Sequence, residues 1–114
     1  LLTGGNVYYY GARPYCDEAD AVVVTAAPKL KVVEDGQRVL IHLNLGQAVY
    51  EARATLVTTQ LLGKAAVAKL GYEHADGSPL RIDTDYFGKR RDEGKPTTGP
   101  FESPATDSLK LNVW

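Results

Sequence analysis

Methionine is absent from this 114-residue sequence, and cysteine occurs once, at Cys16. A primary translation product begins with methionine, so we expect either a processed chain or a piece of a longer protein. We favour the second interpretation. A single thiol excludes a disulfide within the chain and a cysteine-based zinc site, which needs several thiolates. As a nucleophile Cys16 would need a nearby histidine, and only His42 and His74 are available. We therefore interpret Cys16 as an inert small residue and both histidines as solvated side chains outside any metal site.

Long apolar runs and an excess of one charge are also missing. No run approaches the roughly 20 residues that a membrane span requires. Thirteen basic residues against fourteen acidic ones leave a net charge of −1, which creates no field that would recruit nucleic acid or an anionic membrane. The sequence thus predicts neither a nucleic-acid partner nor a membrane partner. Its 44% hydrophobic and 24% charged residues are typical of one globular domain over residues 1–114.

Patterns typical of β-strands, separated by Gly and Pro turns, make up most of the chain. The clearest is a hairpin whose two-residue turn we place at Asp35-Gly36. In its second arm, alternation puts Val39, Ile41 and Leu43 on a buried face and Leu40 with His42 on the other. In all, strands are expected over residues 6–10, 21–25, 29–34, 37–45, 54–62, 80–87 and 109–114.

The remaining segments read as connections. Residues 46–53 fit either a helical turn or a bent connection, and residues 64–71 fit a single turn or an extended edge. Residues 92–105 contain three prolines and read as a loop. The predicted fold is all-β, a mostly antiparallel two-layer β-sandwich of about six or seven short strands. The alternative is the terminal portion of a right-handed parallel β-helix with an antiparallel cap.

Two carboxylates stand out in the strand expected over residues 80–87. Asp83 and Asp85 would project from one face, about 7 Å apart along the backbone. Such a pair can act as acid and base in glycoside hydrolysis or bind calcium. Arg81 shares that face and a basic cluster follows at residues 89–91, so we favour a solvated, salt-bridged face. No catalytic residue, metal site or cofactor is assigned.

Tyrosine is the dominant aromatic residue, with seven tyrosines against two phenylalanines and one tryptophan. Tyr8 and Tyr10 would share one face of a strand. Exposed planar rings stack on the apolar faces of sugars, and the tyrosine hydroxyl tolerates water. The alternative is packing at the edge of a small core. The sequence therefore gives Tyr8, Tyr10, Tyr86 and Trp114 as candidate carbohydrate-binding residues.

Three motifs carry a resemblance to a known family. They are residues 76–79 (DGSP), residues 85–91 (DYFGKRR) and residues 99–102 (GPFE). In this order they resemble the C-terminal region of secreted right-handed parallel β-helix proteins of bacterial polysaccharide degradation, and residues 5–15 resemble the end of the last coils. The resemblance implies a secreted or cell-envelope, carbohydrate-active parent in which this region is a C-terminal module.

Three functions follow from these patterns. The leading hypothesis is a non-catalytic accessory or carbohydrate-binding module of a polysaccharide-active protein, with a polysaccharide or oligosaccharide as its partner. The second is the C-terminal part of a glycoside hydrolase or polysaccharide lyase, with Asp83 or Asp85 at the rim of its active site. The third is a structural cap that contacts a neighbouring domain of the same parent protein.

Overall fold

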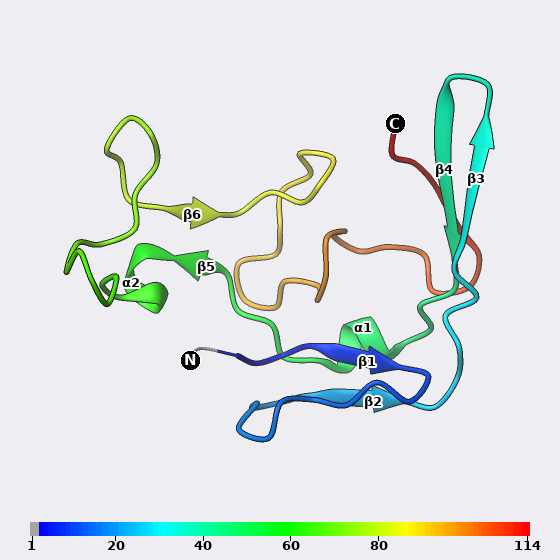
Figure 1. Cartoon of the computed structure of the whole chain (residues 1–114), viewed down its shortest axis with the longest axis horizontal. Helices are drawn as coiled ribbons and strands as arrows, with labels where there is room; N and C mark the ends of the chain where they lie inside the picture. Colours follow the sequence, from blue (N-terminus) through cyan, green and yellow to red (C-terminus); the bar gives the residue numbers. More distant parts are fainter. Residues whose placement is uncertain (1–2) are drawn as a thin grey trace.

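The computed structural model describes residues 3–114, which form seven short strands and two single-turn helices (Figure 1). The strands are β1 (Val7–Tyr9), β2 (Val22–Val24), β3 (Lys31–Asp35), β4 (Arg38–Leu43), β5 (Val57–Thr58), β6 (Arg81–Ile82) and β7 (Leu109–Asn112). The helices are α1 (Ala48–Glu51) and α2 (Thr59–Leu62). Valine and tyrosine fill β1 and β2, as expected of residues that favour extended backbone.

The strands form three small sheets. β3, β4 and β7 make an antiparallel sheet in that order, and β5 pairs antiparallel with β6. β1 and β2 pair in parallel. The predicted all-β fold of six or seven short, mostly antiparallel strands is confirmed, and the arrangement is consistent with a small β-sandwich.

The β3–β4 hairpin is present, but its turn lies one residue later than predicted. Asp35 pairs with Arg38, so the turn residues are Gly36 and Gln37 rather than Asp35 and Gly36. Gly36 has a φ of +63°, and a positive φ at the first central position is what a type II′ turn requires. Alternation also misplaced Leu40, which is 8% exposed and is the buried residue of β4.

Two predicted strands are much shorter than expected. The strand expected over residues 54–62 stops after Thr58, whose hydroxyl accepts a hydrogen bond of 3.1 Å from the Leu61 amide and so caps α2. The strand expected over residues 80–87 stops at Ile82, because the chain then folds back on itself through a bridge between Thr84 and Arg90. Residues 46–53 contain the single turn α1.

The core is small and partly polar. Among residues 3–114 the buried apolar side chains are Leu40, Ala48, Val49, Ala52 and Leu56, together with Pro96 and Pro104. Thr97 and Glu102 are also buried. They belong to the loop of residues 91–106, which crosses the centre of the molecule between the sheets and which we call the central loop (Figure 1).

The chain is open for its size. Its radius of gyration is 16.1 Å, whereas a compact domain of this length has about 13 Å. Its accessible surface is 8152 Å², about 2,000 Å² above the roughly 6,100 Å² of a compact monomer of this mass. No helix in residues 3–114 combines the length and apolarity needed to cross a membrane.

Candidate functional site: an aromatic surface beside an uncharged hollow

A tight turn at residues 85–88 presents two neighbouring rings to solvent. Oδ1 of Asp85 accepts hydrogen bonds of 2.9 Å from the amides of Phe87 and Lys89. The turn closes with bonds between the Asp85 and Lys89 main chains and through Gly88, whose φ is +79°. This geometry leaves Tyr86 59% and Phe87 53% exposed.

A third ring joins them from the central loop. Phe87 and Phe101 stack at a centroid separation of 5.6 Å and an interplanar angle of 19°. Tyr86 meets Phe87 edge-on at 5.0 Å and Phe101 edge-on at 6.2 Å. These are favourable aromatic geometries, and we call Tyr86, Phe87 and Phe101 the aromatic cluster.

Hydrogen bonds fix the turn to the central loop. The Tyr86 amide donates to the Pro100 carbonyl at 2.9 Å, and the Glu102 amide donates to Oδ2 of Asp85 at 2.9 Å. The Lys89 ammonium donates to the Glu102 carbonyl at 2.9 Å. Main-chain and side-chain groups of the turn therefore bind the main chain of the central loop and hold the cluster.

Two of the four predicted carbohydrate-binding residues lie near each other here. The Tyr86 hydroxyl donates to the Val113 carbonyl at 3.1 Å, which brings Tyr86 next to the residue preceding Trp114. Trp114 is 84% exposed, and its carbonyl accepts from the Val39 amide. Phe87 and Phe101 were not among the predicted binding residues, although both lie in the motifs at residues 85–91 and 99–102.

The other two predicted residues lie on a different part of the molecule. Tyr8 is in β1, half-buried, and its hydroxyl donates to Oε2 of Glu18 at 2.5 Å. Tyr10 follows β1 with a φ of +48° and is 75% exposed. β1 runs along one side of the molecule and the 85–88 turn along the opposite side (Figure 1).

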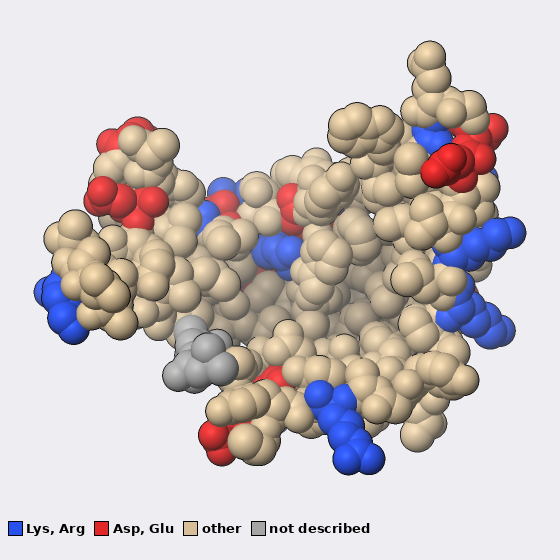
Figure 2. Space-filling view, viewed as in Figure 1, with Lys and Arg blue, Asp and Glu red and all other residues tan. Residues whose placement is uncertain are grey.

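A hollow of about 280 Å³ adjoins the aromatic cluster at Phe101. Its other walls are largely apolar: Val7 and Tyr9 of β1, Leu43 at the end of β4, Leu45 just after it, and Pro100 of the central loop. The Tyr9 hydroxyl donates to the Leu45 carbonyl at 2.7 Å and so keeps its ring along the wall. Figure 2 shows this hollow as an uncharged surface with most of the acidic and basic side chains at the periphery.

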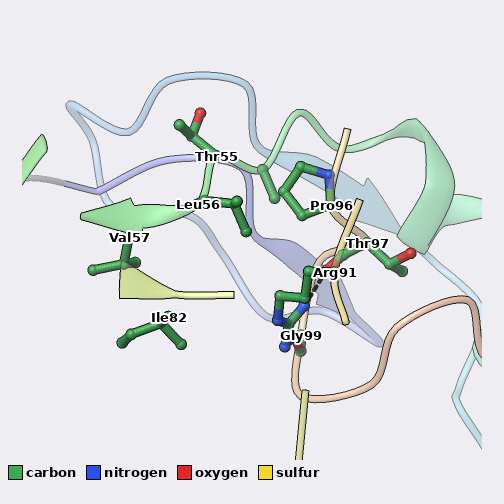
Figure 3. Close-up of a pocket in the computed structure, with 9 residues that line it drawn as sticks. Thr55, Leu56, Val57, Ile82, Arg91, Pro96, Thr97 and Gly99 are labelled. Carbon is green, nitrogen blue, oxygen red and sulfur yellow. Dashed lines mark hydrogen bonds between the residues drawn. The ribbon is translucent and has the colours of Figure 1, made fainter. Parts of the chain in front are cut away.

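A second pocket, of about 180 Å³, is less suited to a ligand (Figure 3). Leu56, Val57 and Ile82 line it together with Arg91. The guanidinium of Arg91 already donates to the carbonyls of Thr97 at 3.0 Å and Gly99 at 2.8 Å. Arg91 thus holds residues 97–99 of the central loop in place.

The two aspartates singled out in the sequence are occupied by structural contacts. Oδ2 of Asp83 accepts from Arg90 at 2.8 Å and lies 3.4 Å from Arg81, as the salt-bridged interpretation predicted. Asp85 has its pKa held below the usual value, first by the hydrogen bond from the Glu102 amide and further by the amides of Lys89 and Phe87. A general acid of a glycosidase needs a raised pKa. This arrangement does not favour the pair as acid and base.

The histidine prediction needs one correction. His42 is half-buried rather than solvated, and its Nε2 has no hydrogen-bond partner. It lies between Lys31 and Lys110 on the neighbouring strands. Among residues 3–114, no group of three or more acidic, histidine or cysteine side chains could hold a metal ion.

Comparison with known proteins gives one structural relative to set beside this geometry. No family model matches the chain, and no curated protein matches it. A solved structure of a protein named XylC in complex with xylose is similar, with a TM-score of 0.83 and 28% identity over 96% of this chain. The match spans 17% of the XylC chain, so this chain corresponds to a small part of that protein.

Proposed function

We propose that this chain is a non-catalytic accessory module of a secreted or cell-envelope polysaccharide-active protein. In this proposal, the aromatic cluster and Trp114 contact the glycan. The observation that carries it is the set of three packed, partly exposed rings beside an uncharged hollow. Rings of this kind offer flat apolar faces to sugar rings. The similarity to part of a protein solved with xylose supports a carbohydrate ligand.

The test is a titration of the 114-residue chain with xylose, xylo-oligosaccharides and unrelated oligosaccharides, followed by NMR or calorimetry. Removing one stacking ring with Tyr86→Ala or Trp114→Ala is expected to weaken binding roughly five- to tenfold. Tyr10→Ala is the matched control, because Tyr10 is similarly exposed but lies outside the cluster. Binding lost with Tyr10→Ala and kept with Tyr86→Ala would move the site to β1, whereas no binding by the unmodified chain would refute the proposal.

A second candidate function is packing against a neighbouring domain of the parent protein. It is favoured by the lobe formed by β5, β6, α2 and the loop between them. The lobe leaves five apolar side chains at least 39% exposed: Leu61, Val67, Leu70, Tyr72 and Ile82. Interaction surfaces typically gather exposed apolar side chains on one part of a molecule, as this lobe does. Hydrogen exchange should show residues 61–72 protected in the parent protein and open in the isolated chain; equal exchange in both would exclude this contact.

A further inference from the structure

β3 is an edge strand with a free side. It pairs with β4, and among residues 3–114 no strand pairs with its other edge. Because Asp35 and Arg38 flank a two-residue turn, alternate residues of β3 direct their main-chain groups at β4, namely Lys31, Val33 and Asp35. The amides and carbonyls of Val32 and Glu34 therefore point outward.

The side chains of this edge are open as well. Four of the five β3 residues are exposed, and only Val33 is half-buried. Val32 is 59% exposed, and Leu30, just before the strand, is 63% exposed. Charged residues on an edge normally discourage indiscriminate strand pairing. In β3 the basic Lys31 and the acidic Asp35 lie at opposite ends of the strand, and this arrangement permits one particular pairing.

The sequence of β3 is complementary to itself in the antiparallel direction. When a second copy is aligned about Val33, the outward main-chain groups of Val32 meet those of Glu34 in the other copy. Lys31 then lies opposite Asp35 of the second copy, twice by symmetry, and Val33 lies opposite its own counterpart. These are the non-hydrogen-bonded positions, where opposing side chains approach most closely.

We propose that β3 pairs with β3 of a second copy of this chain, joining the two three-stranded sheets into one six-stranded sheet. The contact is isologous, as expected of a two-fold dimer. Arg38 binds Oδ2 of Asp35 and leaves Oδ1 for Lys31 of the other copy.

The test is sedimentation equilibrium of the 114-residue chain from micromolar to millimolar concentration. A concentration-dependent dimer is expected. Lys31→Asp and Asp35→Lys each place like charges opposite one another twice, so each variant alone should dimerise about thirtyfold more weakly. An equimolar mixture of the two variants restores both attractive pairs and should recover dimer formation.

The matched control is Lys110→Asp. Lys110 lies on β7, at the opposite edge of the same sheet, and like Lys31 it is paired with His42. This variant should dimerise as well as the unmodified chain, and circular dichroism checks that every variant is folded. A chain that stays monomeric at millimolar concentration overturns the proposal. So does an equal effect of Lys31→Asp and Lys110→Asp, or a mixture that fails to recover the dimer.

Discussion

The amide of Glu102 donates a hydrogen bond of 2.9 Å to Oδ2 of Asp85, across 17 residues of sequence. The other carboxylate oxygen of Asp85 holds the amides of Phe87 and Lys89. One side chain thus shapes the turn that carries Tyr86 and Phe87 and also fixes it to the loop that carries Phe101. The geometry of the aromatic cluster depends on this carboxylate.

Asp85→Asn should therefore disturb the aromatic cluster. The amide group of asparagine replaces one acceptor oxygen with a donor, which cannot accept from both sides. We expect displaced ring signals of Tyr86 and Phe87 in NMR spectra and weaker glycan binding. Asp83→Asn is the control, since the Asp83 carboxylate pairs with Arg81 and Arg90 and makes no bond to the 85–88 turn, and it should leave the ring signals in place. Unchanged ring signals in Asp85→Asn would contradict the role given to Asp85.

The contact between Tyr8 and Glu18 predicts that the stability of the fold depends on pH in both the acidic and the alkaline range. The Tyr8 hydroxyl lowers the pKa of Glu18 below 4.5, and the same hydrogen bond raises the pKa of Tyr8 above 10.0. Stability from Glu18 is present above pH 4.5 and is lost as the pH falls through the folded-state pKa. Stability from Tyr8 is present below pH 10.0 and is lost as the pH rises through its folded-state pKa.

Tyr8→Phe removes the shared hydrogen bond, so it should flatten the dependence of unfolding free energy on pH at both ends. Urea denaturation from about pH 3 to about pH 11 measures the effect. Tyr10→Phe alters a tyrosine with no side-chain hydrogen bond to Glu18 and serves as the comparison. An unchanged pH profile in Tyr8→Phe would show that the pair does not contribute to stability.

The buried carboxylate of Glu102 predicts a large loss of stability on truncation. Its oxygens accept from the Thr97 amide at 3.0 Å and the Asp92 amide at 3.4 Å, and Oε2 lies 3.6 Å from Arg91. Glu102→Ala leaves these donors without an acceptor and should cost roughly 3 kcal/mol of unfolding free energy. Glu102→Gln keeps an acceptor and should cost less. Equal losses in the two variants would show that the negative charge of Glu102, which both variants remove, matters more than the acceptor that glutamine keeps.

Alanine substitutions at two glycines allow the stability cost of backbone strain to be compared with the cost of steric overlap. Gly36 has a positive φ, but a Cβ at this position would meet no other atom within 4 Å, so Gly36→Ala should cost about 1 kcal/mol. A Cβ on Gly5 would lie 2.5 Å from the Arg53 carbonyl oxygen, in addition to a φ of +66°. Gly5→Ala should therefore cost roughly 3 kcal/mol or more. Thermal denaturation of both variants measures the difference, and equal losses would contradict the close contact at Gly5.

Local patterns in the sequence predicted the strands well where neighbouring residues determine the structure. The β3–β4 hairpin and β7 lie where alternation placed them, and β1 and β2 match their runs of β-branched and aromatic residues. The turn between β3 and β4 was misplaced because Asp35-Gly36 and Gly36-Gln37 both fit a two-residue turn, and only the pairing of Asp35 with Arg38 decides between them.

Long-range contacts explain what the sequence did not predict. The strand expected over residues 80–87 is interrupted because the Asp85 carboxylate binds its own turn and the distant Glu102 amide. The aromatic cluster was missed for the same reason, since Phe101 reaches Phe87 only through that loop. Leu40 is buried although alternation placed it on the polar face, because alternation alone does not show which side chains tertiary packing covers.

The long-range hydrogen bonds of the central loop can form only after the β3–β4 hairpin has been synthesised. The β3–β4 hairpin joins residues close in sequence and can form as soon as it is synthesised. In contrast, the hydroxyl of Thr98 donates to the Gly5 carbonyl across 93 residues, and the Asp92 and Thr97 amides bind the carboxylate of Glu102. Because synthesis runs from the amino end, the first of these bonds waits for Thr98 and the others wait for Glu102 to leave the ribosome. Until then the nascent chain can form its hairpin but lacks the hydrogen bonds that hold the central loop in place.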